Sequence, residues 1–440
     1  MLVASYYFYM SWEPVYGALL LGSTLVDYWC GLSLAASSNK RARKWWATLS
    51  IATNLGVLFT FKYLAFFTNA ALEAVSLLGG TQFEMIEAMI LPIGISFYTF
   101  QSMSYTIDVY RREVKMEPHF GKFALFVSFF PQLVAGPVER FKNLMPQIHK
   151  TKLINLDEWI PAIRLIIWGF FKKLVIADRL ALFVEPVFAS VPEYSALTHV
   201  IAGFFFVVQV YCDFSGYSDI AIGTAKLFGY DLMLNWRRPL LSRSLVEFWK
   251  RNHISLTTWF RDYLYISLGG SRCSKQRWIF NIFLVFIISS VWHGSNWTFM
   301  VWGLMHGIVY IFEITLFKNV KIPWLGWPYL ILFHTISLMA FRAESVSDLL
   351  LMYQSVFSLD FSWIQLNTDL LKMNSFIHIL LLNTLFVVFL FAKELIEEHK
   401  IGELIQAKKS IYRPAFYIVI FVGLFVFGEF NANEFFYFQF

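Results

Sequence analysis

Residues 291–307 read VWHGSNWTFMVWGLMHG, and this stretch sets ionisable and polar side chains between apolar runs. His293, Ser295 and Asn296 stand between two tryptophans, at the point where two hydrophobic segments meet. An ionisable group at membrane depth is costly to bury, so it marks a functional site by default. The stretch therefore predicts a pair of membrane helices and the place where the chemistry of this protein occurs.

The composition around this stretch is that of an integral membrane protein. Of the 440 residues, 58% are hydrophobic and only 15% are charged, whereas a soluble domain carries about 25% charged residues. Apolar runs of about 20 residues, the length that crosses a bilayer, recur along the chain. We expect spans at 15–36, 47–67, 87–108, 160–178, 196–228, 278–293, 297–317, 323–342, 375–395 and 413–430. The expected fold class is an all-α polytopic membrane protein.

Two segments depart from simple spans. The run 120–138 is apolar, but Pro131, Gly136 and Pro137 break it. We expect it to be re-entrant or interfacial, which requires that protein cover its free backbone groups. Residues 237–277 are amphipathic and basic, which is typical of a segment that lies on or dips into the cytoplasmic face.

The distribution of Lys and Arg among the loops predicts the orientation. Basic loops are expected in the cytoplasm, and they are 40–44, 111–122, 140–152, 237–277, 318–321 and 400–413. Loops 69–86, 185–195 and 343–370 carry acids and almost no basic residues, so we expect them outside. Threading the chain accordingly makes 431–440 an extracytoplasmic aromatic tail. Residues 1–440 show no repeat or linker and are expected to form a single membrane domain.

The charges, cysteines and histidines exclude several kinds of function. The net charge of +6 is spread over short clusters with no block of six like charges, so we expect no nucleic-acid partner. Cys30, Cys212 and Cys273 match no disulfide or zinc spacing. No Cys or acidic cluster surrounds His293 or His306, which favours proton transfer over metal binding.

The histidines of 291–307 suggest acid–base chemistry. A neutral imidazole at His293 can take a proton from an attacking hydroxyl, a step worth about 10²–10⁴-fold. Asn296 or Ser295 can orient the ring or donate to a developing oxyanion. The alternative for His293 is an interhelical hydrogen bond that only holds a helix hairpin. For His306, on an aromatic helical stripe with Trp302, simple packing is the somewhat stronger alternative.

A second polar segment lies within 237–277. His253, Thr257 and Arg261 recur at i, i+4 and i+8, so a helix would present them on one face. A cytoplasmic basic rim there would suit a phosphorylated donor. Its candidate members are Lys250, Arg251, Arg261 and Arg272. From composition alone, plain positive-inside anchoring is the favoured explanation of these charges.

Two carboxylates, Asp213 and Asp219, lie inside an apolar stretch and need partners at membrane depth. The candidate partners are Lys172, Lys173 and Arg238. An acid pair can serve as a proton relay. A structural knot of hydrogen bonds is favoured, in which Gly216 lets two helices approach closely.

The chain ends in GEFNANEFFYFQF (428–440), with five aromatic residues among the last six. Such a cluster is ordinarily part of an interfacial aromatic belt. Alternatively, the tail threads back into a funnel in the protein and presents the Tyr437 hydroxyl to a catalytic base.

Together these motifs resemble the membrane-bound O-acyltransferases, in the bacterial branch that acts on alginate, peptidoglycan and other exopolysaccharides. The matching stretches are FVSFFPQLVAGPVERF (126–141), DFSGYSDIAIG (213–223), FWKRNHISLTTWFRDYLYISLGGSR (248–272), VWHGSNWTFMVWGLMHG (291–307), FRAES (341–345) and FFYFQF (435–440). The resemblance implies a cup of about 10–11 transmembrane helices with re-entrant and interfacial helices. It also implies an acyl donor from the cytoplasm and an acceptor from the other side.

The resemblance carries the essential family histidine onto His293, a second one onto His253, and a further family position onto His306. In the related D-alanyl transfer system, an aromatic C-terminal motif on a small partner supplies an acyl-accepting tyrosine. The tail here looks like that motif fused to the enzyme, which nominates Tyr437. Relatives in this branch usually begin with a further hydrophobic helix before the stretch that resembles residues 2–14. This chain opens almost directly there, which we interpret as a late start, a truncated form or the lack of one helix.

The implied activity is transfer of acetyl from cytosolic acetyl-CoA across the bacterial cytoplasmic (inner) membrane to an extracytoplasmic polysaccharide. Basic residues of 237–277 would hold the CoA phosphates, and no metal is expected. An SGNH-type esterase or transferase outside, docked near 343–370, would pass the acetyl group to the sugar. Two alternatives stay open. One is the same fold carrying D-alanine or another acyl group, and the other is a proton-coupled transporter or flippase, although the chain shows no duplicated halves.

Overall fold

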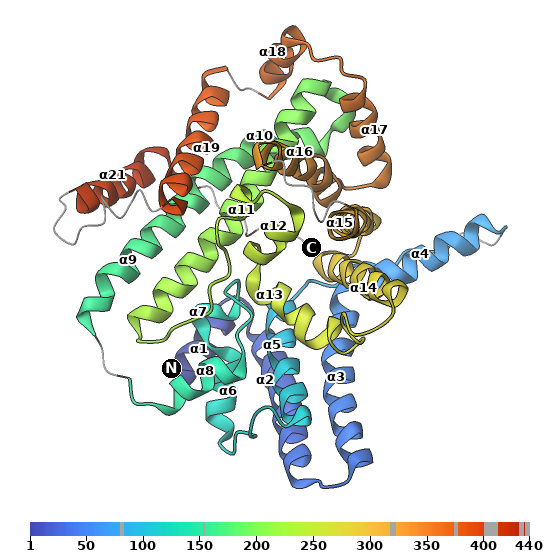
Figure 1. Ribbon diagram of the computed structural model, residues 1–440, viewed down its shortest axis with the longest axis vertical. Coiled ribbons are helices and arrows are strands. Elements are labelled where there is room, and N and C mark those ends of the chain that lie inside the picture. Colours follow the sequence, from blue (N-terminus) through green and yellow to red (C-terminus); the bar gives the residue numbers. More distant parts are fainter. Residues whose placement is uncertain are drawn as a thin grey trace.

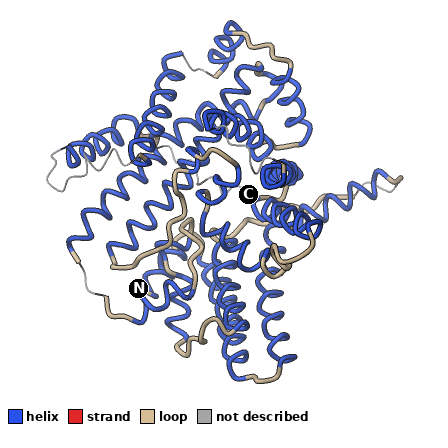
Figure 2. The backbone as a smooth tube through the Cα atoms, in the orientation of Figure 1, coloured by secondary structure: helices blue, strands red, loops and turns tan. Residues whose placement is uncertain are grey.

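The computed structural model describes residues 1–79, 83–152, 155–316, 323–373, 377–399, 412–430 and 435. Within these residues the chain is helical and forms no strand (Figures 1 and 2). The expected all-α class is therefore confirmed.

Four helices in the described part of the chain are long and apolar enough to cross a membrane, as judged by length and composition. They are α2 (Pro14–Ala36), α11 (Ala196–Leu227), α15 (Trp297–Thr315) and α19 (Ile377–Glu398). The pair α3 (Lys40–Lys62) and α4 (Leu64–Leu77) passes the same test together but is bent by 63° at its junction. Figure 1 shows α4 projecting away from the body of the protein.

The other expected spans coincide with helices that are shorter or less apolar. They are α5 (Ile95–Arg111), α9 (Leu156–Phe170), α14 (Lys275–His293), α16 (Pro323–Arg342) and α21 (Tyr412–Phe427). The helix α5 begins at Ile95 and not at residue 87, because Pro92 and the left-handed Gly94 (φ 74°) precede it. The expected total of about 10–11 transmembrane helices stays a prediction.

Short helices connect these elements. The α-helices are α1 (Leu2–Met10), α6 (Phe120–Ser128), α7 (Phe130–Leu133), α8 (Phe141–His149), α10 (Asp178–Ala189), α12 (Leu245–Arg251), α13 (Ile254–Trp259), α17 (Val346–Phe357) and α18 (Trp363–Lys372). The π-helices are η1 (Phe171–Ala177) and η4 (Phe260–Tyr265), and the 3₁₀ turns are η2 (Val191–Glu193) and η3 (Pro239–Leu241).

The predicted break within 120–138 is confirmed. The helix α6 ends at Ser128, and α7 starts again with Pro131 in its first turn, where a missing N–H costs nothing. Other parts of the chain satisfy the freed backbone groups. Gln101 Nε2 donates to Phe126 O at 2.6 Å, and Val138 N donates to Ser255 Oγ at 3.0 Å. The broken segment is thus covered by protein, as a re-entrant segment requires.

The segment 237–277 dips into the protein as short helices. The helix α12 ends at Arg251, and α13 begins at Ile254, with His253 between them in a left-handed conformation (φ 45°). Backbone bonds hold this break, since Ile254 N donates to Asn235 O at 2.8 Å and Arg237 N donates to Arg251 O at 2.8 Å. The spacing predicted that His253 and Thr257 lie on one face of a helix. In the structure His253 instead precedes α13 as its N-cap residue, and Thr257 lies within α13.

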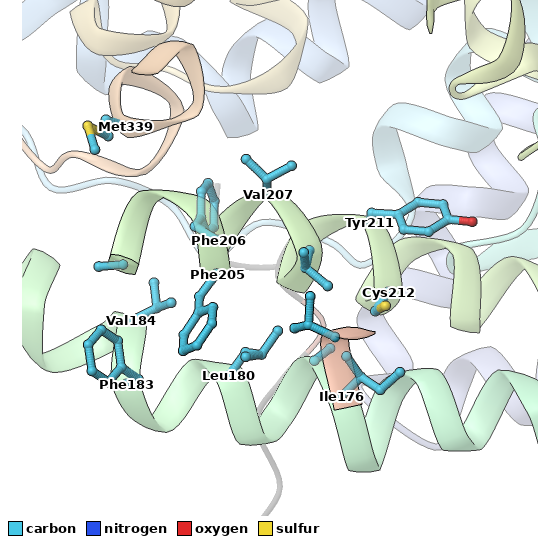
Figure 3. Close-up of a cluster of buried hydrophobic side chains, with 14 of the residues drawn as sticks. Ile176, Leu180, Phe183, Val184, Phe205, Phe206, Val207, Tyr211, Cys212 and Met339 are labelled. Carbon is cyan, nitrogen blue, oxygen red and sulfur yellow. The ribbon is translucent and has the colours of Figure 1, made fainter. Parts of the chain in front are cut away.

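The core lies along α11, which passes through the centre of the molecule (Figure 1). Figure 3 shows α10 facing α11 there. The ring centroids of Phe183 on α10 and Phe205 on α11 are 5.4 Å apart. The helix α9 also lies against α11, and their backbones meet at two glycines. A Cβ on Gly216 would lie 2.8 Å from Gly169 O, and one on Gly169 would lie 2.7 Å from Gly216 O. This confirms the close approach that Gly216 was expected to permit.

Beside this crossing, η1 supplies the partners of the two carboxylates. Lys173 Nζ lies 2.8 Å from Asp213 and 2.7 Å from Asp178, and Lys172 Nζ lies 2.7 Å from Asp219. The third candidate, Arg238, pairs with Glu398 at 2.8 Å instead. Breaking such a buried pair by removing one partner costs about 3–5 kcal/mol. The favoured interpretation as a structural knot agrees with this geometry.

We expect Gly216→Ala to destabilise the protein by about 1–3 kcal/mol, because the added methyl group would collide with the backbone of Gly169. The thermal unfolding midpoint in detergent measures this. Gly56→Ala on α3 is the matched control, since a Cβ there meets nothing within 4 Å. Equal unfolding midpoints for the two variants would contradict the role of the crossing.

Candidate active site

A cavity of about 60 Å³ lies between α11, α12, α15 and α16, with room for a few water molecules. Its wall is mostly aromatic and aliphatic. Of the nine histidines in the chain, four line it: His253, His293, His306 and His334. The first three were predicted from the sequence, and the structure brings them together.

His293 is the last residue of α14 and is 4% exposed. Three rings surround its imidazole edge-to-face, with centroids at 5.0 Å for Trp292, 5.2 Å for Trp302 and 5.4 Å for Phe341. Phe341 belongs to the stretch 341–345 of the resemblance, so two distant motifs meet at this ring. The aromatic cage restricts the orientations open to the ring and excludes bulk water.

His253 reaches the same cavity from the break between α12 and α13. Its Nδ1 lies 3.2 Å from Asn235 Oδ1, and its ring is 4.6 Å from Phe214 and 6.2 Å from Trp292. Burial lowers the pKa of His253 to about 3, so the ring is neutral at neutral pH. A carboxamide oxygen can only accept, so Nδ1 carries the proton and Nε2 has the lone pair. Within the described residues, Nε2 has no hydrogen-bond partner.

His306 and His334 line the part of the cavity next to α16. Their rings are stacked with centroids 5.5 Å apart, and His306 Nε2 lies 3.2 Å from Ser337 Oγ. His306 Nδ1 and both nitrogens of His334 find no partner in the part of the chain that the structure describes. Sequence reasoning missed His334. The signal was present, because an ionisable residue inside the expected span 323–342 is a candidate by the same rule as His293.

No group of three or more His, Cys, Asp or Glu side chains is placed to hold a metal within the described ranges. The unpartnered nitrogens around the cavity are suited instead to hydrogen bonding with a small polar group or water.

Asn296 caps α15. Its side-chain oxygen accepts from Thr298 N at 3.2 Å, and its Nδ2 donates to Glu344 O at 2.7 Å. Both ends of the amide are therefore engaged at the start of the helix. Its predicted action on His293 stays a prediction.

The four candidate basic residues are not gathered in one place around the cavity, and none of them lines it. Arg251 is held by Glu247 at 2.7 Å and Glu398 at 2.8 Å. Arg261 pairs with its neighbour Asp262 at 2.8 Å and is largely exposed. Lys250 and Arg272 are exposed. Their predicted role in holding phosphates stays a prediction.

The expected acyl-accepting Tyr437 lies outside the described residues. One residue of the same tail, Phe435, is described and is 1% exposed. Its ring lies 4.5 Å from Tyr217 and 5.3 Å from Phe214, the residue that also contacts His253. Phe435 is therefore buried next to the wall of the cavity.

The known proteins that are similar to this chain are acyltransferases. The model of the membrane-bound O-acyltransferase family matches residues 33–353. The chain is 40% identical over 363 residues to the probable alginate O-acetylase of Pseudomonas aeruginosa, covering 81% of this chain and 69% of that protein. It is 35% identical over 334 residues to the peptidoglycan O-acetyltransferase of Helicobacter pylori, covering 70% and 62%. It is 29% identical over 235 residues to the teichoic acid D-alanyltransferase of Streptococcus thermophilus, covering 49% and 55%.

We expect Asn235→Ala to lower the rate of acyl transfer about 10- to 100-fold, because His253 would lose the acceptor that orients its ring. The initial rate of release of the donor's thiol measures this. Ser255→Ala is the matched control, since Ser255 Oγ donates to the same oxygen at 2.9 Å and its loss leaves the contact to His253 in place. Equal rates for the two variants would show that the orientation of His253 is unimportant.

Proposed function

This chain belongs to the membrane-bound O-acyltransferase family, and we propose that it moves an acetyl group from cytosolic acetyl-CoA to an extracytoplasmic polysaccharide. It is a membrane O-acyltransferase, and its relatives include proteins named for O-acetylation of alginate and of peptidoglycan. In our proposal it lies in the bacterial cytoplasmic membrane, where one face meets the acetyl-CoA pool and the other meets the glycan.

The observation that carries the proposal is the meeting of His293 and His253 in one cavity, although they come from different segments of the chain. The ring of Trp292 is near both, with its centroid 5.0 Å from that of His293 and 6.2 Å from that of His253. Acyl transfer needs a base for the attacking hydroxyl and hydrogen-bond partners for the thioester. In this aromatic cavity His293 can serve as the base, and Nε2 of His253, free among the described residues, can accept a proton close by.

In the proposed step, an acceptor hydroxyl attacks the thioester carbonyl and His293 takes its proton. A C–O bond forms and the C–S bond breaks as the tetrahedral intermediate collapses. The proton then passes to the leaving thiolate. His253, neutral and held by Asn235, keeps a lone pair on Nε2 that is free among the described residues, and it would aid the movement of this proton.

The donor would enter from the cytoplasmic side past residues 237–277. Among the predicted phosphate-binding residues, Lys250, Arg261 and Arg272 are exposed, so they are accessible to CoA phosphates, although Arg261 also pairs with Asp262. Arg251 is less suited, because two carboxylates already neutralise it.

We further propose that the first acceptor is Tyr437 on the tail. Phe435 supports this relay, because its buried ring contacts Phe214 on the wall of the cavity. An extended chain advances at most about 3.6 Å per residue, so the chain two residues further on remains within about 7 Å of Phe435. The acyl-tyrosine would then be attacked by a hydroxyl on an SGNH-type partner outside, which passes the acetyl group to sugar.

A second candidate is D-alanyl transfer by the same site, which the similarity to a teichoic acid D-alanyltransferase favours over about half of the chain. Membership of an acyltransferase family favours either reaction over proton-coupled transport. The two acyl groups differ in charge, so labelled donors distinguish them.

We expect intact-protein mass spectrometry after incubation with isotope-labelled acetyl-CoA to show one acetyl adduct on the wild type. His293→Ala should lower adduct formation at least about 100-fold, because no base remains for the hydroxyl. Its unfolding midpoint should stay within a few degrees of the wild type. An undiminished rate in the variant would remove His293 from the chemistry.

We expect Tyr437→Phe to abolish the adduct and the acetylation of polysaccharide in cells, since the ring without its hydroxyl cannot form the ester. Phe435→Ala should lower adduct formation about tenfold by releasing the tail from its buried seat. Phe430→Ala is the matched control, because Phe430 is 58% exposed. Normal acetylation by Tyr437→Phe would rule out the relay and indicate direct transfer.

A further inference from the structure

A lysine from a distant helix reaches the backbone of the candidate base. Lys62 is the last residue of α3, and its Nζ donates to Trp292 O at 2.8 Å and to His293 O at 3.0 Å. The two contacts join segments that are about 230 residues apart in sequence. Lys62 played no part in the sequence-based prediction of the site.

The position of this ammonium suits the end of a helix. The last four carbonyl groups of a helix have no partner within it, and they carry the negative end of the helix dipole. Trp292 and His293 supply two such carbonyls at the end of α14. A lysine side chain satisfies carbonyls of this kind and interacts favourably with the dipole.

The ammonium of Lys62 is committed to these carbonyls and not to an acid. No Asp or Glu lies within ion-pair distance of it among the described residues. Its other neighbours are aromatic, with the centroids of Tyr63 and Trp292 at 6.0 and 5.9 Å. Placing a cation beside apolar rings at the end of a membrane helix costs free energy. A role in holding the end of α14 in place would explain why a lysine is present there.

The contact bears directly on His293, because the backbone on its other side is also constrained. Gly294 follows in an extended conformation, and a Cβ there would lie 2.1 Å from the ring of Phe299. The imidazole is caged by rings and can shift little by itself. The position of the His293 Cα atom, and with it that of the imidazole, therefore depends on the hydrogen bond between Lys62 and the His293 carbonyl.

Lys62 also lines a second cavity, of about 160 Å³, together with Trp292. Trp12, Tyr16 and Phe97 belong to the same wall. Trp12 is 60% exposed, so this cavity opens at the surface of the protein. A small amine can therefore reach the position of the ammonium if the side chain is shortened.

We propose that Lys62 is a positioning residue, which holds the end of α14 through the carbonyls of Trp292 and His293 and so places the imidazole of His293 for acyl transfer. The inference rests on the proposed function of His293. It assigns Lys62 no contact with the reacting atoms. A misplacement of about 1 Å can lower a rate about 100-fold, which sets the size of the expected effect.

The test measures kcat and KM for acetyl-CoA in purified Lys62→Met, whose side chain is of similar length but cannot donate. We expect kcat to fall about 10- to 100-fold with KM within about twofold of the wild type. Lys62→Arg should recover most of kcat, because a guanidinium can still donate to the carbonyls. Lys44→Met is the matched control, since Lys44 is exposed in the first turns of the same helix.

Chemical rescue separates a missing cation from lost packing. Lys62→Ala should regain part of its kcat with ethylammonium in the buffer, and should gain nothing from potassium at the same ionic strength. Wild-type kcat in Lys62→Met, or a loss in Lys62→Ala that ethylammonium does not relieve, would overturn the proposal. If Lys62→Met does not fold, Lys62→Leu, which also cannot donate, takes its place, and a wild-type kcat would again overturn the proposal.

His293→Ala is assayed in parallel to keep the two proposals apart. If that variant retains transfer, the proposed function of His293 fails, whatever Lys62 does. If His293→Ala is inactive and Lys62→Met is fully active, only the positioning role of Lys62 fails.

Discussion

The backbone contact between Gly169 and Gly216 is the constraint on which most of this protein depends. Because neither residue has a side chain, α9 and α11 meet at their backbones, which brings the lysines of η1 beside the acids of α11. Asp213 turns into that ionic cluster, while the next residue, Phe214, lines the cavity. A wider crossing would separate the ion pairs and move the wall against which His253 packs.

The cavity itself is built by interrupting helices. His253 enters it in a left-handed conformation between α12 and α13, and His293 stands at the end of α14, where Gly294 continues the chain in an extended conformation. Side chains at helix ends reach places that a regular helical face does not present. The cost of each interruption is the loss of backbone hydrogen bonds, and Asn235 and Lys62 offset it by bonding to the groups left over.

The buried lysines beside the helix crossing and the histidines of the cavity have different surroundings. Lys172 and Lys173 are neutralised by carboxylates, so they hold helices together and are unavailable for chemistry. The histidines are surrounded by aromatic rings, and the described residues place no carboxylate beside His253 or His334. Neutral imidazoles in a mostly aromatic cavity are well suited to taking up a proton and returning it within one reaction.

Patterns within a single segment were enough to establish the membrane class, the ends of α11 and α16, the break near Pro131, the need of Asp213 and Asp219 for lysine partners, and His293 as the candidate base. These follow from hydrophobic length, from proline chemistry and from the cost of burying charge, which act locally along the chain. The tertiary contacts determine the rest. They pair Arg251 with Glu398, place His334 next to His306, seat Phe435 against Phe214 and bring Lys62 to His293. Each of these depends on a neighbour many residues away, and hydropathy and spacing along one segment carry no information about such neighbours.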